Sequence, residues 1–140
     1  LRCRLCRRRL LCLKPNPQVE RRVRQQRNGT EYLYFYTEKR VTDSGKWETE
    51  RPISQKAYIQ YLMEGDSSLH AVHKVKYRFT YEHQSFAVDV YPFCKDKAVM
   101  RVAVPSEMGG VVLPPEVTIL EEVTGRPEFK NKYLAKCQQL

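Results

Sequence analysis

Residues 74–91 read Lys-Val-Lys-Tyr-Arg-Phe-Thr-Tyr-Glu-His-Gln-Ser-Phe-Ala-Val-Asp-Val-Tyr, and this stretch decides the fold. Side chains alternate with period two over 74–81 and again over 84–91, which is typical of two β-strands. Glu82 and His83 leave room for a tight turn between them. The stretch therefore predicts an antiparallel hairpin, and a fold built mostly from β-strands around it.

The first strand of this hairpin carries a row of cations. Lys74, Lys76 and Arg78 share one face, with about 6.6 Å between neighbours at a rise of about 3.3 Å per residue. Like charges so placed repel one another unless an anion faces them. Two interpretations stay open: a sheet with a solvated basic face, or cations that line an enclosed cavity.

The chain has the length and composition of one soluble globular domain. It has 140 residues, 41% hydrophobic and 29% charged, and its longest apolar runs are far shorter than the ~20 residues of a membrane span. Its net charge is +9, but residues 1–19 hold six basic residues and no acid. The remainder is only mildly basic, which argues against a nucleic-acid partner. Five cysteines, an odd number at uneven spacing, favour a reducing cytosol over a disulfide framework.

Residues 1–18 are predicted to form an Arg/Cys/Leu-rich tail and proline linker, ahead of one domain at 19–140. The tail is interpreted either as a solvated segment or as an anchor for acidic lipid. Further strands are expected at 19–26, 31–40, 46–51, 97–105 and 117–124, with an Asn28-Gly29 turn between the first two. Short helices are expected at 54–64, capped by Ser54, and at 128–138. The fold class is α+β, mostly β and antiparallel.

Charged residues recur at every second position on several of these strands. If the strands close into a small barrel of about eight, such rows line a lumen that can hold one small ligand. Basic rows would bind a polyanion through charge-assisted hydrogen bonds. Acidic rows would bind Mg²⁺ or Mn²⁺, which prefer carboxylate oxygens.

Six motifs in order make residues 20–135 resemble the CYTH, or triphosphate tunnel metalloenzyme, superfamily. They are Arg22-Val23-Arg24, Tyr36-Thr37-Glu38-Lys39-Arg40, the stretch 48–54 with its E-x-E, Lys74-Val75-Lys76-Tyr77-Arg78, Val88-Asp89-Val90-Tyr91, and the stretch 122–131 that begins Glu-Val-Thr-Gly. The chain is most similar to CYTH-like domains fused behind a P-loop nucleotide-binding domain, as in TRP translocation defect-like proteins. Such a P-loop domain would lie outside this chain.

The resemblance implies a tunnel barrel of about eight strands, of which the first has no match in this chain. It also implies a role for each matching residue. The implied phosphate-binding residues are Arg22, Arg24, Lys39, Lys74, Lys76 and Arg78. The implied metal ligands, for Mg²⁺ or Mn²⁺, are Glu48, Glu50, Asp89 and Glu122. No residue is assigned a catalytic role.

Two departures from the family pattern weaken the case for catalysis. The family's first strand carries E-x-E-x-K, where this chain has Arg2 and Arg4, and a later acidic pair falls at Arg101 and Ala103. We therefore expect binding of a phosphate-rich ligand (polyphosphate, nucleotide or phospholipid head group) in a cationic tunnel, with impaired catalysis. Such a domain would be accessory to the P-loop domain, in the cytoplasm or peripheral to a membrane. The alternatives are an active metal-dependent inorganic or nucleoside triphosphatase, and an interaction module whose tail docks on acidic lipid.

Overall fold

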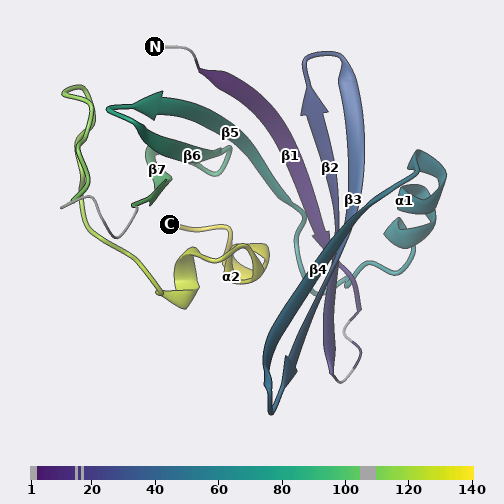
Figure 1. Cartoon of the computed structure of the whole chain (residues 1–140). Helices are drawn as coiled ribbons and strands as arrows, with labels where there is room; N and C mark the ends of the chain where they lie inside the picture. Colours follow the sequence, from purple (N-terminus) through teal and green to yellow (C-terminus); the bar gives the residue numbers. More distant parts are fainter. Residues whose placement is uncertain (1–2, 15, 17, 105–109) are drawn as a thin grey trace.

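One antiparallel sheet of seven strands, in the order β4-β3-β2-β1-β5-β6-β7, organises the chain (Figure 1). The computed structural model describes residues 3–14, 16, 18–104 and 110–140. The strands are β1 (Arg4–Cys12), β2 (Val19–Asn28), β3 (Glu31–Thr42), β4 (Gly45–Ile53), β5 (Val72–Tyr81), β6 (Gln84–Tyr91) and β7 (Cys94–Ala103). The helical elements are α1 (Gln55–Leu62), the single 3-10 turn η1 (Pro127–Phe129) and α2 (Asn131–Cys137). The expected α+β class, mostly antiparallel β, is confirmed.

The two predicted hairpins are present, each with a two-residue turn. Glu82 and His83, with φ of 45° and 62°, join β5 to β6. Gly29, with φ of 60°, and Thr30 join β2 to β3, one residue later than the predicted Asn28-Gly29 turn. Both turns use the left-handed backbone region, whose twist matches that of the flanking strands. The register of each pair is thereby fixed, and with it the face on which every side chain lies.

The prediction of a tail at residues 1–18 is wrong for residues 4–12. This segment is β1, and it lies in the middle of the sheet, paired with β2 on one side and β5 on the other. Leu10 and Leu13 are buried, at 5% and 3% exposure. The arginines on both faces hid the alternation, whereas the paired backbone and these two leucines stabilise the strand. The segment expected as a tail therefore supplies a central strand of the sheet.

The last expected strand, at 117–124, is also wrong. The described residues 110–126 contain no strand, and Ile119 and Leu120 are largely exposed. The sheet is consequently open in the described part of the chain, with β4 and β7 as its two edges. It curves into a trough, as Figure 1 shows. The segment expected as one C-terminal helix is divided into η1 and α2.

Each face of the sheet has its own apolar cluster. On the outer face, α1 packs its Tyr58 against Leu13, Val23 and Tyr36, and Ser54 caps α1 by accepting a hydrogen bond from the Ala57 amide at 3.1 Å. Replacing such a cap by alanine typically costs about 1 kcal/mol.

Inside the trough, α2 packs Leu134 and Ala135 against Leu10, Val72 and Val99. This contact covers the concave face around Leu10, Val72 and Val99. None of the described helices has both the length and the apolar character needed to cross a membrane.

Candidate functional site

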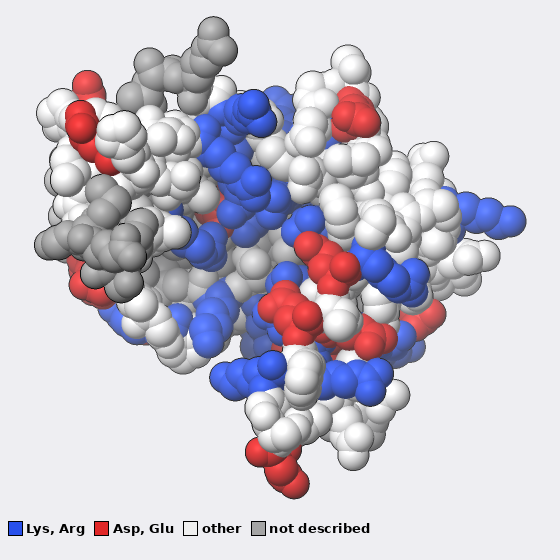
Figure 2. Space-filling model, in the orientation of Figure 1, with Lys and Arg blue, Asp and Glu red and all other residues white. Residues whose placement is uncertain are grey.

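Strand register brings the predicted phosphate-binding residues to one face of the sheet. Directly paired residues of antiparallel strands share a face, and pairs such as Arg8 with Lys74, Cys6 with Lys76 and Arg22 with Thr37 trace the concave side. The cations of this concave face are Arg4, Arg8, Arg22, Arg24, Lys39, Lys74, Lys76, Arg78 and Arg101. Its carboxylates are Glu20, Glu48, Glu50 and Asp89. Figure 2 shows lysine and arginine side chains gathered along a hollow in the molecule.

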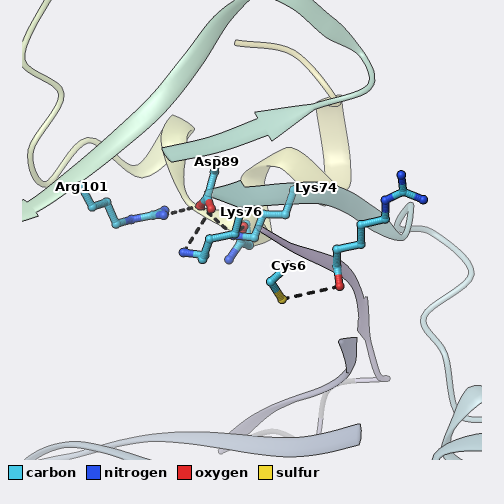
Figure 3. A network of polar contacts seen from close by, with 7 residues as sticks. Cys6, Lys74, Lys76, Asp89 and Arg101 are labelled. Carbon is cyan, nitrogen blue, oxygen red and sulfur yellow. Dashed lines mark hydrogen bonds and ion pairs between the residues drawn. The ribbon is translucent and has the colours of Figure 1, made fainter. Parts of the chain in front are cut away.

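One buried carboxylate holds three of these cations together (Figure 3). Asp89, fully buried in β6, lies 2.9 Å from the Lys74 Nζ and 3.1 Å from the Lys76 Nζ. The Arg101 guanidinium, from β7, contacts the same Asp89 oxygen as Lys74. Lys74 also donates to the Asn131 side-chain oxygen at 3.3 Å, which links the cluster to α2. We call these four residues, Lys74, Lys76, Asp89 and Arg101, the Asp89 cluster.

The Asp89 cluster is desolvated and carries more positive than negative charge. Burial opposes ionisation of Asp89, yet Lys74, Arg101 and Lys76 outweigh it and lower the pKa of this carboxyl to about 2. Burial lowers the pKa of Lys74 to about 8 against the attraction of Asp89, and it also lowers the pKa of Lys76. Burial and the Asp89 charge raise the pKa of the neighbouring Tyr91 to about 12. Asp89 balances only part of the positive charge of Lys74, Lys76 and Arg101, so a further anion would be attracted to the cluster.

On the other half of the concave face, two arginines each pair with a separate glutamate. Arg22 lies 3.4 Å from Glu48, and Arg24 lies 3.1 Å from Glu50. Thr37 donates a hydrogen bond to Glu50 at 3.2 Å.

Two neighbours further constrain Arg24. Its guanidinium stacks over the Phe35 ring at 4.4 Å. Burial and the nearby Arg8 lower the pKa of Arg24. The Arg24 guanidinium thus contacts both the Phe35 ring and the Glu50 carboxylate.

The four predicted metal ligands do not converge. Glu48 and Glu50 face arginines, Asp89 faces three cations, and Glu122 accepts a hydrogen bond from its near neighbour Thr124 in the irregular segment after β7. Among the described residues, no group of three or more His, Cys, Asp or Glu side chains is arranged to hold a metal ion. Glu48, Glu50 and Asp89 act as charge partners of cations, and Glu122 lies apart from them, so the donor set does not fit a Mg²⁺ or Mn²⁺ site.

Sequence reasoning missed three cations of the concave face and one of its thiols. Arg4 and Arg8 come from β1, Arg101 comes from β7, and Cys6 lies beside Lys76 in the register. Arg101 stands where the resembled family has a carboxylate, and that inversion was the available signal. In β1 the i, i+2 spacing of Arg4, Cys6 and Arg8 was masked by Arg7 and Arg9 on the opposite face.

Comparison with known proteins supports the fold alone. No protein-family model and no curated protein matches the chain. A solved structure titled "The crystal structure of the hypothetical protein NE1496" is similar, with a TM-score of 0.62 and 22% sequence identity. The match covers 96% of this chain and 88% of that chain. The two chains therefore share an architecture over nearly their whole length.

Proposed function

We propose that the concave face binds a phosphate-rich ligand: a polyphosphate, a nucleotide phosphate tail or a phospholipid head group. The observation that carries this proposal is the register, which gathers all six predicted phosphate-binding residues with Arg4, Arg8 and Arg101 on one face. Cations outnumber carboxylates there by about two to one. Lysine and arginine bind phosphate oxygens through charge-assisted hydrogen bonds, which are roughly twice as strong as neutral ones.

The middle of the trough is the best place for such a ligand. Adjacent strands lie about 4.8 Å apart, so cations on β1 and β5 can reach successive phosphates of a chain. Among the described residues, Arg8 and Arg78 form no ion pair with a carboxylate, and they flank the Asp89 cluster on these two strands. Asp89 positions the lysines, while Arg8 and Arg78 supply unneutralised charge.

The resemblance to the CYTH superfamily extends this proposal. In that reading the trough is the open form of a phosphate tunnel, and the domain serves as an accessory to a P-loop domain outside the chain. Hydrolysis would be impaired because Arg101 stands in place of an acid and pairs with Asp89. The alternative, a metal-dependent triphosphatase, stays a prediction; it has less support because each described acid of the face has a cationic partner or lies away from the others.

Binding of tripolyphosphate by the full chain, measured by calorimetry, tests the proposal. The variant Lys76→Ala plus Arg78→Ala should weaken binding at least about tenfold, since two charge-assisted contacts are lost. A matched control, Arg40→Ala plus Lys56→Ala, removes two cations from β3 and α1 outside the concave face and should change the affinity less than about twofold. Arg78→Ala alone removes an exposed cation that has no carboxylate partner among the described residues, and it serves as a second variant if the double variant misfolds.

Equal losses in the two double variants would contradict the proposal. Phosphate release measured in parallel, with Mg²⁺ or Mn²⁺, separates the alternatives: metal-dependent turnover that disappears in Asp89→Ala would favour the triphosphatase. Deletion of residues 1–18 cannot serve as a test of tail docking because it removes β1.

A further inference from the structure

A second basic cluster lies on the outer face of the sheet, where the cover by α1 ends. Two transverse rows cross neighbouring strands here: Val75-Arg7-Arg27-Tyr32 and His73-Arg9-Gln25-Tyr34. The next row, Leu11-Val23-Tyr36, lies in the apolar cluster under α1. Because this face is opposite to the concave one, the cluster is separate from the Asp89 cluster.

The charge of this outer cluster is unbalanced. Arg7 and Arg27 are directly opposite each other across β1 and β2, a destabilising arrangement for like charges. Within the described chain, neither Arg7, Arg9 nor Arg27 forms an ion pair with a carboxylate. The Arg9 Nε atom is buried and has no hydrogen-bond partner in the part of the chain that the structure describes. An open hollow of about 170 Å³ is lined by Arg7, Arg9, Arg27 and His73, among others.

An aromatic hollow adjoins the basic one. It has a volume of about 440 Å³ and is lined by Tyr32, Tyr34, Phe35, Ile53 and neighbouring residues. Tyr32 lines both hollows and is 47% exposed, with the Arg27 guanidinium 5.6 Å from its ring centre.

The aromatic hollow exists because β4 ends early. The last residue of β4, Ile53, pairs with Tyr34, so residues 31–33 have β2 on one side and no strand on the other in the described chain. Their outward-facing backbone groups are open to a hydrogen-bonding ligand.

We propose that this outer site binds a nucleotide, with its phosphate on Arg7, Arg9 and Arg27 and its base in the hollow beside Tyr32. The guanidinium groups match phosphate geometry and need an anion to relieve their mutual repulsion. A flat ring can stack on an exposed tyrosine, and the open edge of β3 can hydrogen-bond the polar rim of a base. An inorganic anion would contact the arginines but would leave the hollow beside Tyr32 unused. The nucleotide can be free or a unit of a single strand, because both present the same groups.

Titration of the full chain with 5′-AMP, adenosine, inorganic phosphate and a ten-nucleotide oligo(dA) tests this proposal. AMP should bind at least about fivefold more tightly than phosphate or adenosine. Arg7→Gln plus Arg27→Gln should weaken AMP and phosphate about tenfold. Tyr32→Ala should weaken AMP alone. The control Arg40→Gln removes another outer-face cation, one that is paired with Glu38, and should leave both affinities unchanged.

The concave-face variant Lys76→Ala plus Arg78→Ala keeps the two proposals distinguishable. AMP binding that survives in it but falls in Arg7→Gln plus Arg27→Gln supports the outer site, whatever becomes of the proposed function. AMP binding that falls in the concave-face variant but survives in Arg7→Gln plus Arg27→Gln would overturn the outer site. So would equal affinities for AMP and phosphate, or an equal loss of AMP affinity in Arg40→Gln.

The oligo(dA) arm decides the source of the nucleotide. Affinity above that of AMP indicates a strand, whereas equal affinity indicates a free nucleotide. Removing one of two opposed arginines relieves their repulsion, and Arg27 also donates to the Gly29 carbonyl at 2.8 Å, so Arg7→Gln alone is the folded second variant if the double variant fails to fold.

Discussion

The two halves of the concave face use the same residue types in different ways. In the half formed by β5, β6 and β7, one fully buried carboxylate holds Lys74, Lys76 and Arg101. In the half formed by β2, β3 and β4, each arginine has its own carboxylate, and the Glu48 and Glu50 side chains remain 52% and 39% exposed.

This difference in desolvation decides what each charge contributes. An ion pair in contact with water contributes at most about 1 kcal/mol. A buried charge that loses its partner costs about 3–5 kcal/mol. The Asp89 cluster should therefore contribute more than the other half to the stability of the domain and to its response to anions. The ion pairs of the other half should contribute little to the free energy of unfolding.

Replacing Asp89 should produce the largest effect on stability. Asp89→Ala leaves Lys74 and Lys76 buried without their counterion, so we expect the free energy of unfolding to fall by about 3–5 kcal/mol in urea titrations. Asp89→Asn keeps the shape of the side chain but loses its charge, and should cost nearly as much. Tripolyphosphate should restore more stability to these variants than it adds to the wild-type chain, because an anion then replaces the lost carboxylate.

A loss below about 1 kcal/mol would mean that Asp89 contributes no more than an exposed pair. Loss of stability without rescue by tripolyphosphate would leave Asp89 a structural role and count against ligand binding at this half of the face.

Sequence patterns predicted most of this framework because strand faces follow a period of two. The charged and apolar faces of β5 and β6 are readable directly, and so are the turn at Glu82-His83 and, displaced by one residue, the turn at Gly29-Thr30. β1 escaped because Arg7, Arg8 and Arg9 occupy both faces, which erases the alternation on which strand assignment depends. The segment 117–124 has a strand-like composition, but its backbone pairs with no strand in the described chain.

The candidate site was predictable within each strand but not between strands. The spacing of Lys74, Lys76 and Arg78 places them on one face whatever their partners are. That Asp89 lies opposite Lys76, and that Arg101 reaches the same carboxylate from β7, depends on cross-strand register. Register is set by turns and packing together, so the single chain could suggest metal ligands where the structure has charge partners.

The pH dependence of binding should sharpen the comparison by isolating one cation of the Asp89 cluster. Lys74 has a pKa of about 8, below that of an ordinary lysine, so raising the pH from 7 to 9 removes its charge. The affinity of the chain for tripolyphosphate should then fall by up to about tenfold, the value of one charge-assisted hydrogen bond. Calorimetry at both pH values measures the change.

Lys74→Arg provides the control because its guanidinium stays protonated throughout. Its affinity should change less than about twofold over the same interval, and subtraction of the two profiles removes the titration of the ligand itself. Parallel profiles would show that Lys74 keeps its proton in the complex or does not contact the ligand.

The smallest expected effect is also the one that bears on whether the trough closes. A double-mutant cycle with Arg24→Ala and Glu50→Ala should give a coupling free energy of about 0.2–1 kcal/mol, because Glu50 is 39% exposed in the open sheet. The longer and more exposed pair of Arg22 and Glu48 should give less. A coupling above about 2 kcal/mol, measured by urea unfolding, would require that water is excluded from this half as it is from Asp89. A sheet that closes around its ligand would exclude it, so repeating the cycle with saturating tripolyphosphate asks whether binding converts the open trough into a tunnel.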